Sequence, residues 1–110
     1  MSRSTEYLAA ALRGGHAVRA QVAGMSMWPS LSWGDVVEVE PLRGGEPRPG
    51  DVVAIRDETG VVVHRLIHAS AGHVVTWGDN ATAGDPPRHP GDILGIVRPR
   101  ARRRVLPWLR

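Results

Sequence analysis

Residues 51–69 decide the fold, and they read Asp51-Val-Val-Ala-Ile-Arg-Asp-Glu-Thr-Gly-Val-Val-Val-His-Arg-Leu-Ile-His-Ala69. Apolar and β-branched residues fill both ends of this stretch, and such residues are enriched in strands. Between them lies Asp-Glu-Thr-Gly at 57–60, a composition typical of a hairpin turn. The stretch therefore predicts a β-hairpin with strands at 51–56 and 61–69. Because the second strand opens with three valines, we expect it to be buried on both faces.

Shorter strand patterns flank this hairpin on both sides. Residues 35–41 alternate valine with glutamate, which predicts that Val37 and Val39 face a core. Further strands are expected at 16–22, 73–77 and 92–97. The 13 glycines and 9 prolines favour tight turns between these strands. The predicted fold class is mainly β, a small coiled antiparallel β-barrel or sheet of five to seven short strands with one short N-terminal helix.

The N-terminal segment predicts this helix at residues 4–13. Ser4 can cap its first turn, Leu8 and Leu12 share one face, and two consecutive glycines end it. The chain is thus expected to consist of an N-terminal helix, a β domain and an arginine-rich tail, at residues 1–15, 16–97 and 98–110.

Three Gly-Asp pairs immediately precede predicted strands, at Gly34-Asp35, Gly50-Asp51 and Gly91-Asp92. Glycine permits positive φ at a bend, and the aspartate can accept hydrogen bonds from amides just beyond it. We therefore expect these three pairs to be structural. A fourth pair, Gly78-Asp79, differs because it follows a strand and opens a long loop.

Composition excludes several kinds of chemistry. The chain of 110 residues is long enough for one domain, and it contains neither cysteine nor lysine. Disulfides, thiolate nucleophiles and lysine bases are therefore absent. The spacing of His64 and His68 suits a helix and not a strand, so we expect no metal site. No cofactor is expected either.

The net charge of +3 conceals an asymmetry. Six of the 14 arginines lie in residues 98–110, which hold no acid, leaving 8 arginines against 11 acidic residues elsewhere. This tail is a candidate for contact with an anionic membrane or with nucleic acid, and the alternative is a solvated terminus. No apolar run approaches the ~20 residues of a membrane-spanning helix. We expect a cytoplasmic or peripheral membrane protein.

Three residue types in order along the chain point to nucleophilic catalysis. Ser26 lies in a loop between apolar flanks, and His64 lies among aliphatic neighbours in the strongest predicted strand. The loop that follows residue 77 supplies two carboxylates, Asp79 and Asp85. In a Ser-His-Asp site the hydroxyl attacks, the imidazole takes its proton and the carboxylate orients the imidazole. From spacing alone, Ser26 can equally be a structural serine in a turn, and His64 can be a structural histidine in the core.

A set of short motifs carries a more specific resemblance. They are Gly24-Met-Ser-Met-Trp-Pro-Ser-Leu31, Gly34-Asp-Val-Val37, Gly50-Asp-Val-Val53, Val63-His-Arg-Leu66, Gly78-Asp-Asn80 and Leu94-Gly95. In this order, over about residues 20–97, the chain resembles the signal peptidase I and LexA superfamily of serine peptidases.

The resemblance implies a branch and a set of roles. Bacterial-type signal peptidases and LexA-type proteins have a lysine where this chain has His64, whereas endoplasmic-reticulum, archaeal and sporulation-type signal peptidases have a histidine. By similarity to this histidine branch, Ser26 is the nucleophile, His64 the base and Asp85 the third residue of the catalytic triad. Asp79 would be a supporting carboxylate nearby. Residues expected to bind the substrate and the oxyanion are Gly24, Met25, Met27 and Pro29. Signal peptidases usually have a serine at the position of Gly24, so the oxyanion donors here are expected to be backbone amides, including that of Ser26.

The function expected from this resemblance is a serine endopeptidase that cleaves signal- or leader-like peptides, with residues 16–97 as its catalytic domain. The substrate is expected to bind as an extended strand, with small residues near the cleaved bond. The alternative is a catalytically inactive peptide-binding module of the same fold. An unperturbed imidazole titrates near pH ~6.5, so a histidine base predicts activity that rises through this region.

Overall fold

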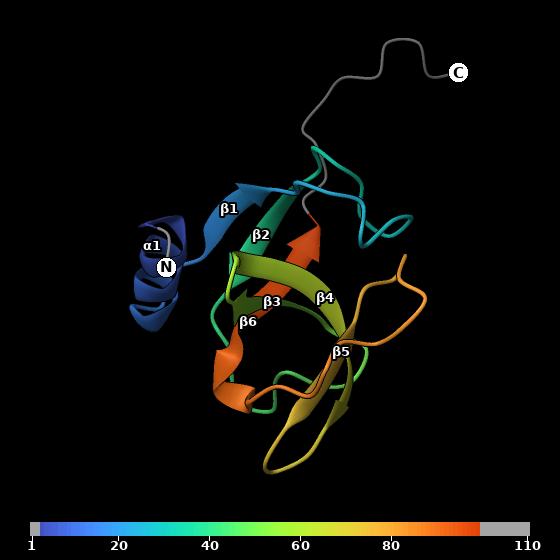
Figure 1. Ribbon diagram of the computed structural model, residues 1–110. Coiled ribbons are helices and arrows are strands. Elements are labelled where there is room, and N and C mark those ends of the chain that lie inside the picture. The colour runs from blue at the N-terminus through green and yellow to red at the C-terminus, as the bar shows by residue number, and fades with distance from the viewer. Residues whose placement is uncertain (1–2, 100–110) are drawn as a thin grey trace, which may run out of the picture.

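One antiparallel sheet organises residues 3–99, the part of the chain that the computed structural model describes (Figure 1). Its six strands have the order β1-β2-β6-β3-β4-β5. In chain order the elements are α1 (Arg3–Arg13), β1 (Val18–Gln21), β2 (Val36–Glu40), β3 (Val52–Asp57), β4 (Gly60–Ala69), β5 (Val74–Trp77), the 3-10 helix η1 (Pro90–Asp92) and β6 (Ile93–Pro99). The predicted mainly β fold with one N-terminal helix is confirmed.

The central hairpin forms where the sequence predicts it, but burial falls on the other strand. Val53 of β3 pairs with His64 of β4, and the strands join through a turn in which Asp57 Oδ1 accepts a hydrogen bond of 2.7 Å from the Thr59 N–H. β3 lies between β6 and β4, and its residues 53–55 are fully buried. The expected burial of residues 61–63 on both faces is wrong, since β5 pairs with β4 only from Arg65 onward.

The core consists of two clusters, and the first fixes the helix and the loop after β1. It contains Leu8 and Leu12 from α1 together with Met27 and Leu31 from that loop. The second cluster fills the other half of the sheet with Val53, Ile55, Leu66, Val74, Ile93 and Ile96. An ion pair of 2.9 Å between Glu6 and Arg56 also holds α1 against β3. The segment around Ser26 is therefore anchored in the core.

Two of the three structural Gly-Asp pairs adopt the expected backbone. Gly34 and Gly50 have φ values of 89° and 99°. Their aspartates act differently from the prediction, because Asp35 and Asp51 accept hydrogen bonds of 2.8 Å from amides three residues upstream. The carboxylates therefore close the preceding turns instead of capping the strands. The third pair lies in η1 and has no positive φ at its glycine.

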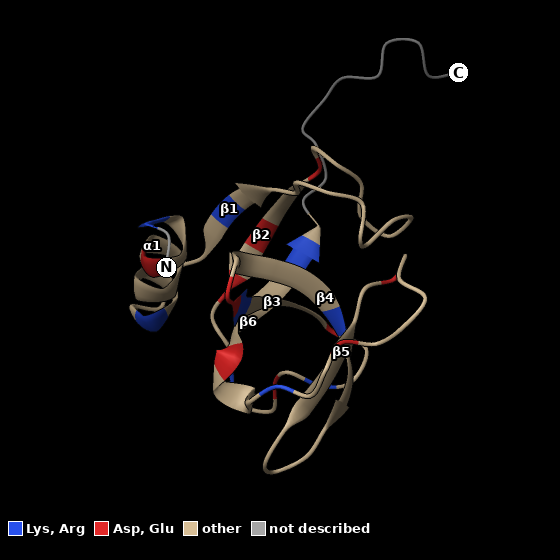
Figure 2. Cartoon of the chain, viewed as in Figure 1, with Lys and Arg blue, Asp and Glu red and all other residues tan. Residues whose placement is uncertain are grey.

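Charges of both signs are spread over the sheet and its loops (Figure 2). Arg98, at the end of β6, pairs with Glu40 at 2.8 Å and with Glu46 at 3.1 Å. The remainder of the predicted arginine-rich tail, residues 100–110, lies outside the described residues. Within residues 3–99 the single α-helix is too short and too polar to cross a membrane.

Gly95 provides a test of this sheet. A methyl group at this position would clash with the backbone carbonyl oxygen of Glu40 and lie 3.0 Å from a side-chain carbon of Val39, both in the adjacent strand β2. We expect Gly95→Ala to lower the free energy of unfolding in urea by about 2 kcal/mol. Gly72→Ala is the matched control, because nothing lies within 4 Å of the added methyl group. Equal losses for the two variants would contradict the predicted packing of β2 against β6.

Candidate active site

The side chains of His64 and Asp85 meet beside strand β5. His64 Nδ1 lies 2.6 Å from Asp85 Oδ2, and the two side chains are only 12% and 18% exposed. His64 comes from the middle of β4, whereas Asp85 comes from the loop that follows β5. Sequence reasoning expected this pairing from resemblance, and the fold brings together two residues 21 positions apart.

Thr76 fixes Asp85 in this position. The Thr76 hydroxyl donates a hydrogen bond of 2.6 Å to Asp85 Oδ2, and the Asp85 N–H donates one of 2.9 Å to the Thr76 carbonyl. Farther along, Arg88 and Val74 exchange two backbone hydrogen bonds, so the loop returns to β5. Sequence reasoning missed Thr76. Thr76 could have been found in the sequence as a polar residue on the same face of the predicted strand as Val74. That face is buried, and a fully buried hydroxyl requires a hydrogen-bond partner.

The surroundings of Asp85 favour its charged form. Burial alone would raise the pKa of Asp85, but hydrogen bonds from Thr76 and His64 lower it below the ordinary value of 3.8. The charges of His64 and Arg88 act in the same direction, and an Arg88 Nη2 lies 4.0 Å from the carboxylate. An ionised Asp85 can only accept hydrogen bonds. It therefore favours the imidazole tautomer of His64 that carries its hydrogen on Nδ1. The free lone pair of a neutral His64 is then on Nε2.

Ser26 lies exposed in a compact turn after β1. The turn closes through hydrogen bonds from Trp28 N to the Met25 carbonyl and from Leu31 N to the Met27 carbonyl, at 3.1 and 2.9 Å. Met27 is only 2% exposed, so it anchors this turn in the core. Gly24 has a φ of 129°, which a serine side chain would strain. The backbone at this position therefore favours glycine.

A second segment clips this turn from outside. The Asn80 N–H donates to the Ser26 carbonyl at 2.9 Å, and the Asn80 side chain donates to the Met25 carbonyl at 3.0 Å. The N–H of Asp79 also points at the Met27 sulfur, at 3.4 Å. Figure 1 shows these two loops, cyan and orange, side by side. Sequence reasoning noted Gly78-Asp79-Asn80 as a motif but did not assign Asn80 this contact.

Gly78 allows the histidine and the serine turn to approach each other. A methyl group at Gly78 would lie 2.8 Å from the Ser26 carbonyl oxygen and 3.0 Å from His64 Nε2. Because Gly78 has no side chain, Nε2 of His64 and the backbone of Ser26 can both pack closely against it. Nε2 is also the nitrogen that the contact with Asp85 leaves free to act as a base.

Asp79 forms no hydrogen bond with His64 among the described residues and belongs to a separate cluster. Its carboxylate receives two hydrogen bonds from the Arg65 guanidinium, at 2.9 and 2.7 Å, and one of 2.6 Å from the Ser30 hydroxyl. Arg65 also donates to the Gly50 carbonyl at 2.8 Å. The cluster joins the turn that carries Ser26, the strand that carries His64 and the loop that carries Asp85. Its carboxylate supports the geometry of the site from outside.

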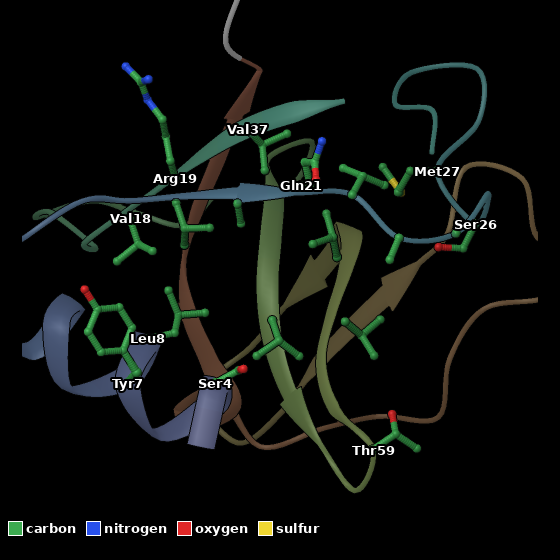
Figure 3. A pocket seen from close by; sticks show the side chains of 18 of the residues that line it. Ser4, Tyr7, Leu8, Val18, Arg19, Gln21, Ser26, Met27, Val37 and Thr59 are labelled. Carbon is green, nitrogen blue, oxygen red and sulfur yellow. The ribbon is translucent and has the colours of Figure 1, made fainter. Parts of the chain in front are cut away.

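A groove leads away from Ser26 (Figure 3). It has a volume of about 780 Å³, and it follows β1 to helix α1 with residues 61–63 of β4 on the opposite side. Gly24 and Met27 line it beside Ser26, whereas Met25 and Pro29 are not among the lining residues. Valine is the commonest of its lining residues, and within residues 3–99 no aspartate or glutamate lines it. Within residues 3–99 no three metal-ligating side chains gather into a metal site.

The contact between Thr76 and Asp85 can be tested by titration. Thr76→Val removes a donor that stabilises the charged carboxylate, so we expect the pKa of Asp85 to rise. Carbon-detected NMR of the Asp85 carboxyl group measures this shift directly. Thr76→Ser keeps the hydroxyl and should keep the lowered pKa. An unchanged pKa of Asp85 in Thr76→Val would contradict the proposed hydrogen bond.

The contact between Arg65 and Asp79 predicts loss of stability in acid. The hydrogen bonds from Arg65 lower the pKa of Asp79 below 3.8, and that of Ser30 adds to them, whereas burial opposes. A lowered pKa in the folded state stabilises the protein at pH values above the unfolded pKa, and this contribution is lost as pH falls through the folded value. We expect the free energy of unfolding to fall less steeply below pH ~4 in Asp79→Asn than in the wild type. Glu58→Gln, on the exposed hairpin turn, is the control, and parallel pH profiles for Asp79→Asn and the wild type would contradict the prediction.

Comparison with known proteins identifies the family of the chain. No curated protein gives a significant match to the chain. The family model described as Peptidase S24-like matches residues 2–97, a range that includes Ser26, His64 and Asp85. This match supports the superfamily expected from the sequence motifs. The chain therefore belongs to the Peptidase S24-like family.

Proposed function

We propose that this protein is a serine endopeptidase in which Ser26 is the nucleophile, His64 the general base and Asp85 the residue that orients His64. The observation that carries the proposal is the 2.6 Å contact between His64 Nδ1 and Asp85, which leaves Nε2 free beside the turn that holds Ser26. Membership of a peptidase-type family supports the same reaction class.

The reaction follows from these positions. The Ser26 hydroxyl oxygen attacks the carbonyl carbon of the scissile amide, and its proton passes to Nε2 of His64. His64 then donates this proton to the leaving amine as the carbon–nitrogen bond breaks, which leaves an ester on Ser26. Water attacks the ester and gives a proton to Nε2 of His64, which returns it to the Ser26 oxygen as the ester bond breaks and the acid product leaves. Asp85 stabilises the imidazolium at each step without taking a proton itself.

A backbone amide is the proposed donor to the oxyanion. Among residues 3–99, the Ser26 N–H donates no hydrogen bond. The clip from Asn80 uses the carbonyls of Met25 and Ser26 and leaves this N–H available. Donors fixed before the reaction stabilise developing negative charge without reorganisation. In this proposal the Asn80 clip thus orients the oxyanion donor as well as the nucleophile.

Two free strand edges favour an extended peptide as the substrate. β1 is the terminal strand of the sheet, and residues 61–64 of β4 precede the part that pairs with β5. β1 and residues 61–63 both line the groove that leads to Ser26. A peptide laid between them can form main-chain hydrogen bonds with both edges. The apolar walls fit a hydrophobic, leader- or signal-like peptide.

The finer assignment is to a signal peptidase of the histidine type. It rests on His64 at the position of the base and on a second loop aspartate, Asp85, at its Nδ1. The complete absence of lysine leaves no side-chain amine that could replace His64. The preference for small residues next to the cleaved bond is carried over from the resemblance and belongs to this proposal.

A fluorophosphonate probe tests the nucleophile. We expect covalent labelling at Ser26, and we expect its rate to fall about 10³-fold in His64→Ala, because the general base is lost. Ser32→Ala is the matched control in the same loop and should label at the wild-type rate. Intact-mass spectrometry of the labelled protein and of its peptides measures both the extent and the position.

The same samples separate the enzyme from its alternative, an inactive peptide-binding module. Cleavage of a leader-like peptide library that stops in Ser26→Ala supports the endopeptidase. Peptide binding without cleavage, together with labelling that does not depend on Ser26, would contradict it.

A further inference from the structure

Helix α1 forms the end of the groove opposite Ser26. Ser4, Tyr7 and Leu8 line this end, and Val18 and Val39 line it with them. Figure 3 shows the Tyr7 ring beside Val18 and Leu8, at the other end of β1 from Ser26. The proposed catalytic residues do not require a helix at this place. His64 comes from β4 and Asp85 from the loop after β5, and Thr76, which positions Asp85, comes from β5.

Tyr7 is unusual for its place on this helix. The face of α1 that packs on the sheet is buried, and it consists of Thr5, Leu8, Ala9 and Leu12. Tyr7 is 69% exposed, although it is the only tyrosine in a chain that contains no phenylalanine. The core contacts of Leu8 and the ion pair between Glu6 and Arg56 hold the helix in place. Tyr7 is therefore an exposed aromatic ring on a fixed support.

We propose that Tyr7 and its neighbours form a distal subsite that binds an apolar side chain of the substrate peptide. This inference rests on the proposed function. The groove is apolar here, and its charged lining residues are both cations, Arg3 and Arg19. Figure 3 shows the Arg19 side chain directed away from Tyr7. A leucine-like side chain removes apolar surface of Tyr7, Leu8 and Val18 from water, whereas a cationic side chain finds no carboxylate among the described residues that line the groove.

The length of β1 sets the distance of this subsite from the scissile bond. Val18, beside Tyr7, precedes Ser26 by eight residues. An extended chain advances ~3.3 Å per residue, so eight residues span at most about 26 Å. Because β1 ends at Gln21 and Ser26 lies in a turn, the subsite lies roughly 20–25 Å from the nucleophile. A substrate strand that runs beside β1 would therefore place a residue there about six to eight positions from the cleaved bond. Short peptides cannot reach this subsite.

A leucine scan tests the proposal. The peptides are about 18 residues long, with alanine on both sides of the central bond and serine at the other positions. Each peptide carries a single leucine, which is placed at a different distance from the bond on one side or the other. We expect leucine about six to eight residues from the bond, on one side only, to raise kcat/KM about tenfold. Tyr7→Ala should remove this gain and Tyr7→Phe should keep it. Ile67→Ala is the matched control, because Ile67 is 45% exposed and does not line the groove.

Truncated peptides and a binding assay separate this inference from the proposed function. Peptides with four residues on each side of the bond should be cleaved equally well by the wild type and by Tyr7→Ala. If no peptide is cleaved and Ser26 is not labelled, the proposed function fails. The long peptides of the leucine scan, labelled with a fluorophore, can then be titrated with the Ser26→Ala variant. Their fluorescence anisotropy measures the leucine preference in binding directly. Absence of a distal preference in the anisotropy and cleavage assays, or a preference that survives Tyr7→Ala, overturns the subsite.

Discussion

One carboxylate oxygen of Asp85 receives hydrogen bonds from both His64 and Thr76, each 2.6 Å long. A charged group that is only 18% exposed remains charged when such partners and a nearby arginine stabilise it. The proposed chemistry depends on this charge, because an ionised Asp85 directs the lone pair of His64 toward the serine turn. The sheet supplies the partners, since Thr76 lies on β5 and His64 on the adjacent strand β4.

The other constraint is steric. Gly78 occupies the point where the imidazole of His64 and the backbone of Ser26 approach each other, and any side chain there would push them apart. The next two residues of the same loop hold the arrangement from opposite sides. Asp79 binds Arg65 and Ser30, and Asn80 binds the backbone of the serine turn. A short motif thus combines clearance for the site with two attachments that fix its geometry.

Much of the fold was predictable from the sequence because periodicity reports local structure. The hairpin at 51–69 and the alternation in 35–41 predicted strands that the structure contains. Burial was less predictable. The valines at 61–63 line the groove, and their exposure depends on where β5 begins to pair with β4. Position within a sheet is a property of the topology, and a pattern confined to one strand does not contain it.

The candidate site shows the same division. The order of residue types along the chain already offered Ser26, His64 and two aspartates as candidates, but composition and spacing could not decide which aspartate meets the histidine. The resemblance assigned that role to Asp85. The structure separates them, with Asp85 at His64 and Asp79 at Arg65. Thr76 and the clip from Asn80 were missed because both depend on a long loop that folds back on β5. The sequence also could not predict that α1 lines the groove, since no sequence pattern connects the helix with the distant Ser26.

The central claim is that Asp85 holds the hydrogen of His64 on Nδ1 and leaves Nε2 free as the base. Nitrogen-15 NMR of a histidine-labelled sample, at a pH where the imidazole is neutral, measures this tautomer directly. We expect a strongly deshielded, hydrogen-bonded proton on His64 Nδ1 in the wild type and in Asp79→Asn, and its loss in Asp85→Asn. A proton on Nε2 in the wild type, or an Nδ1 signal unaffected by Asp85→Asn, would contradict it.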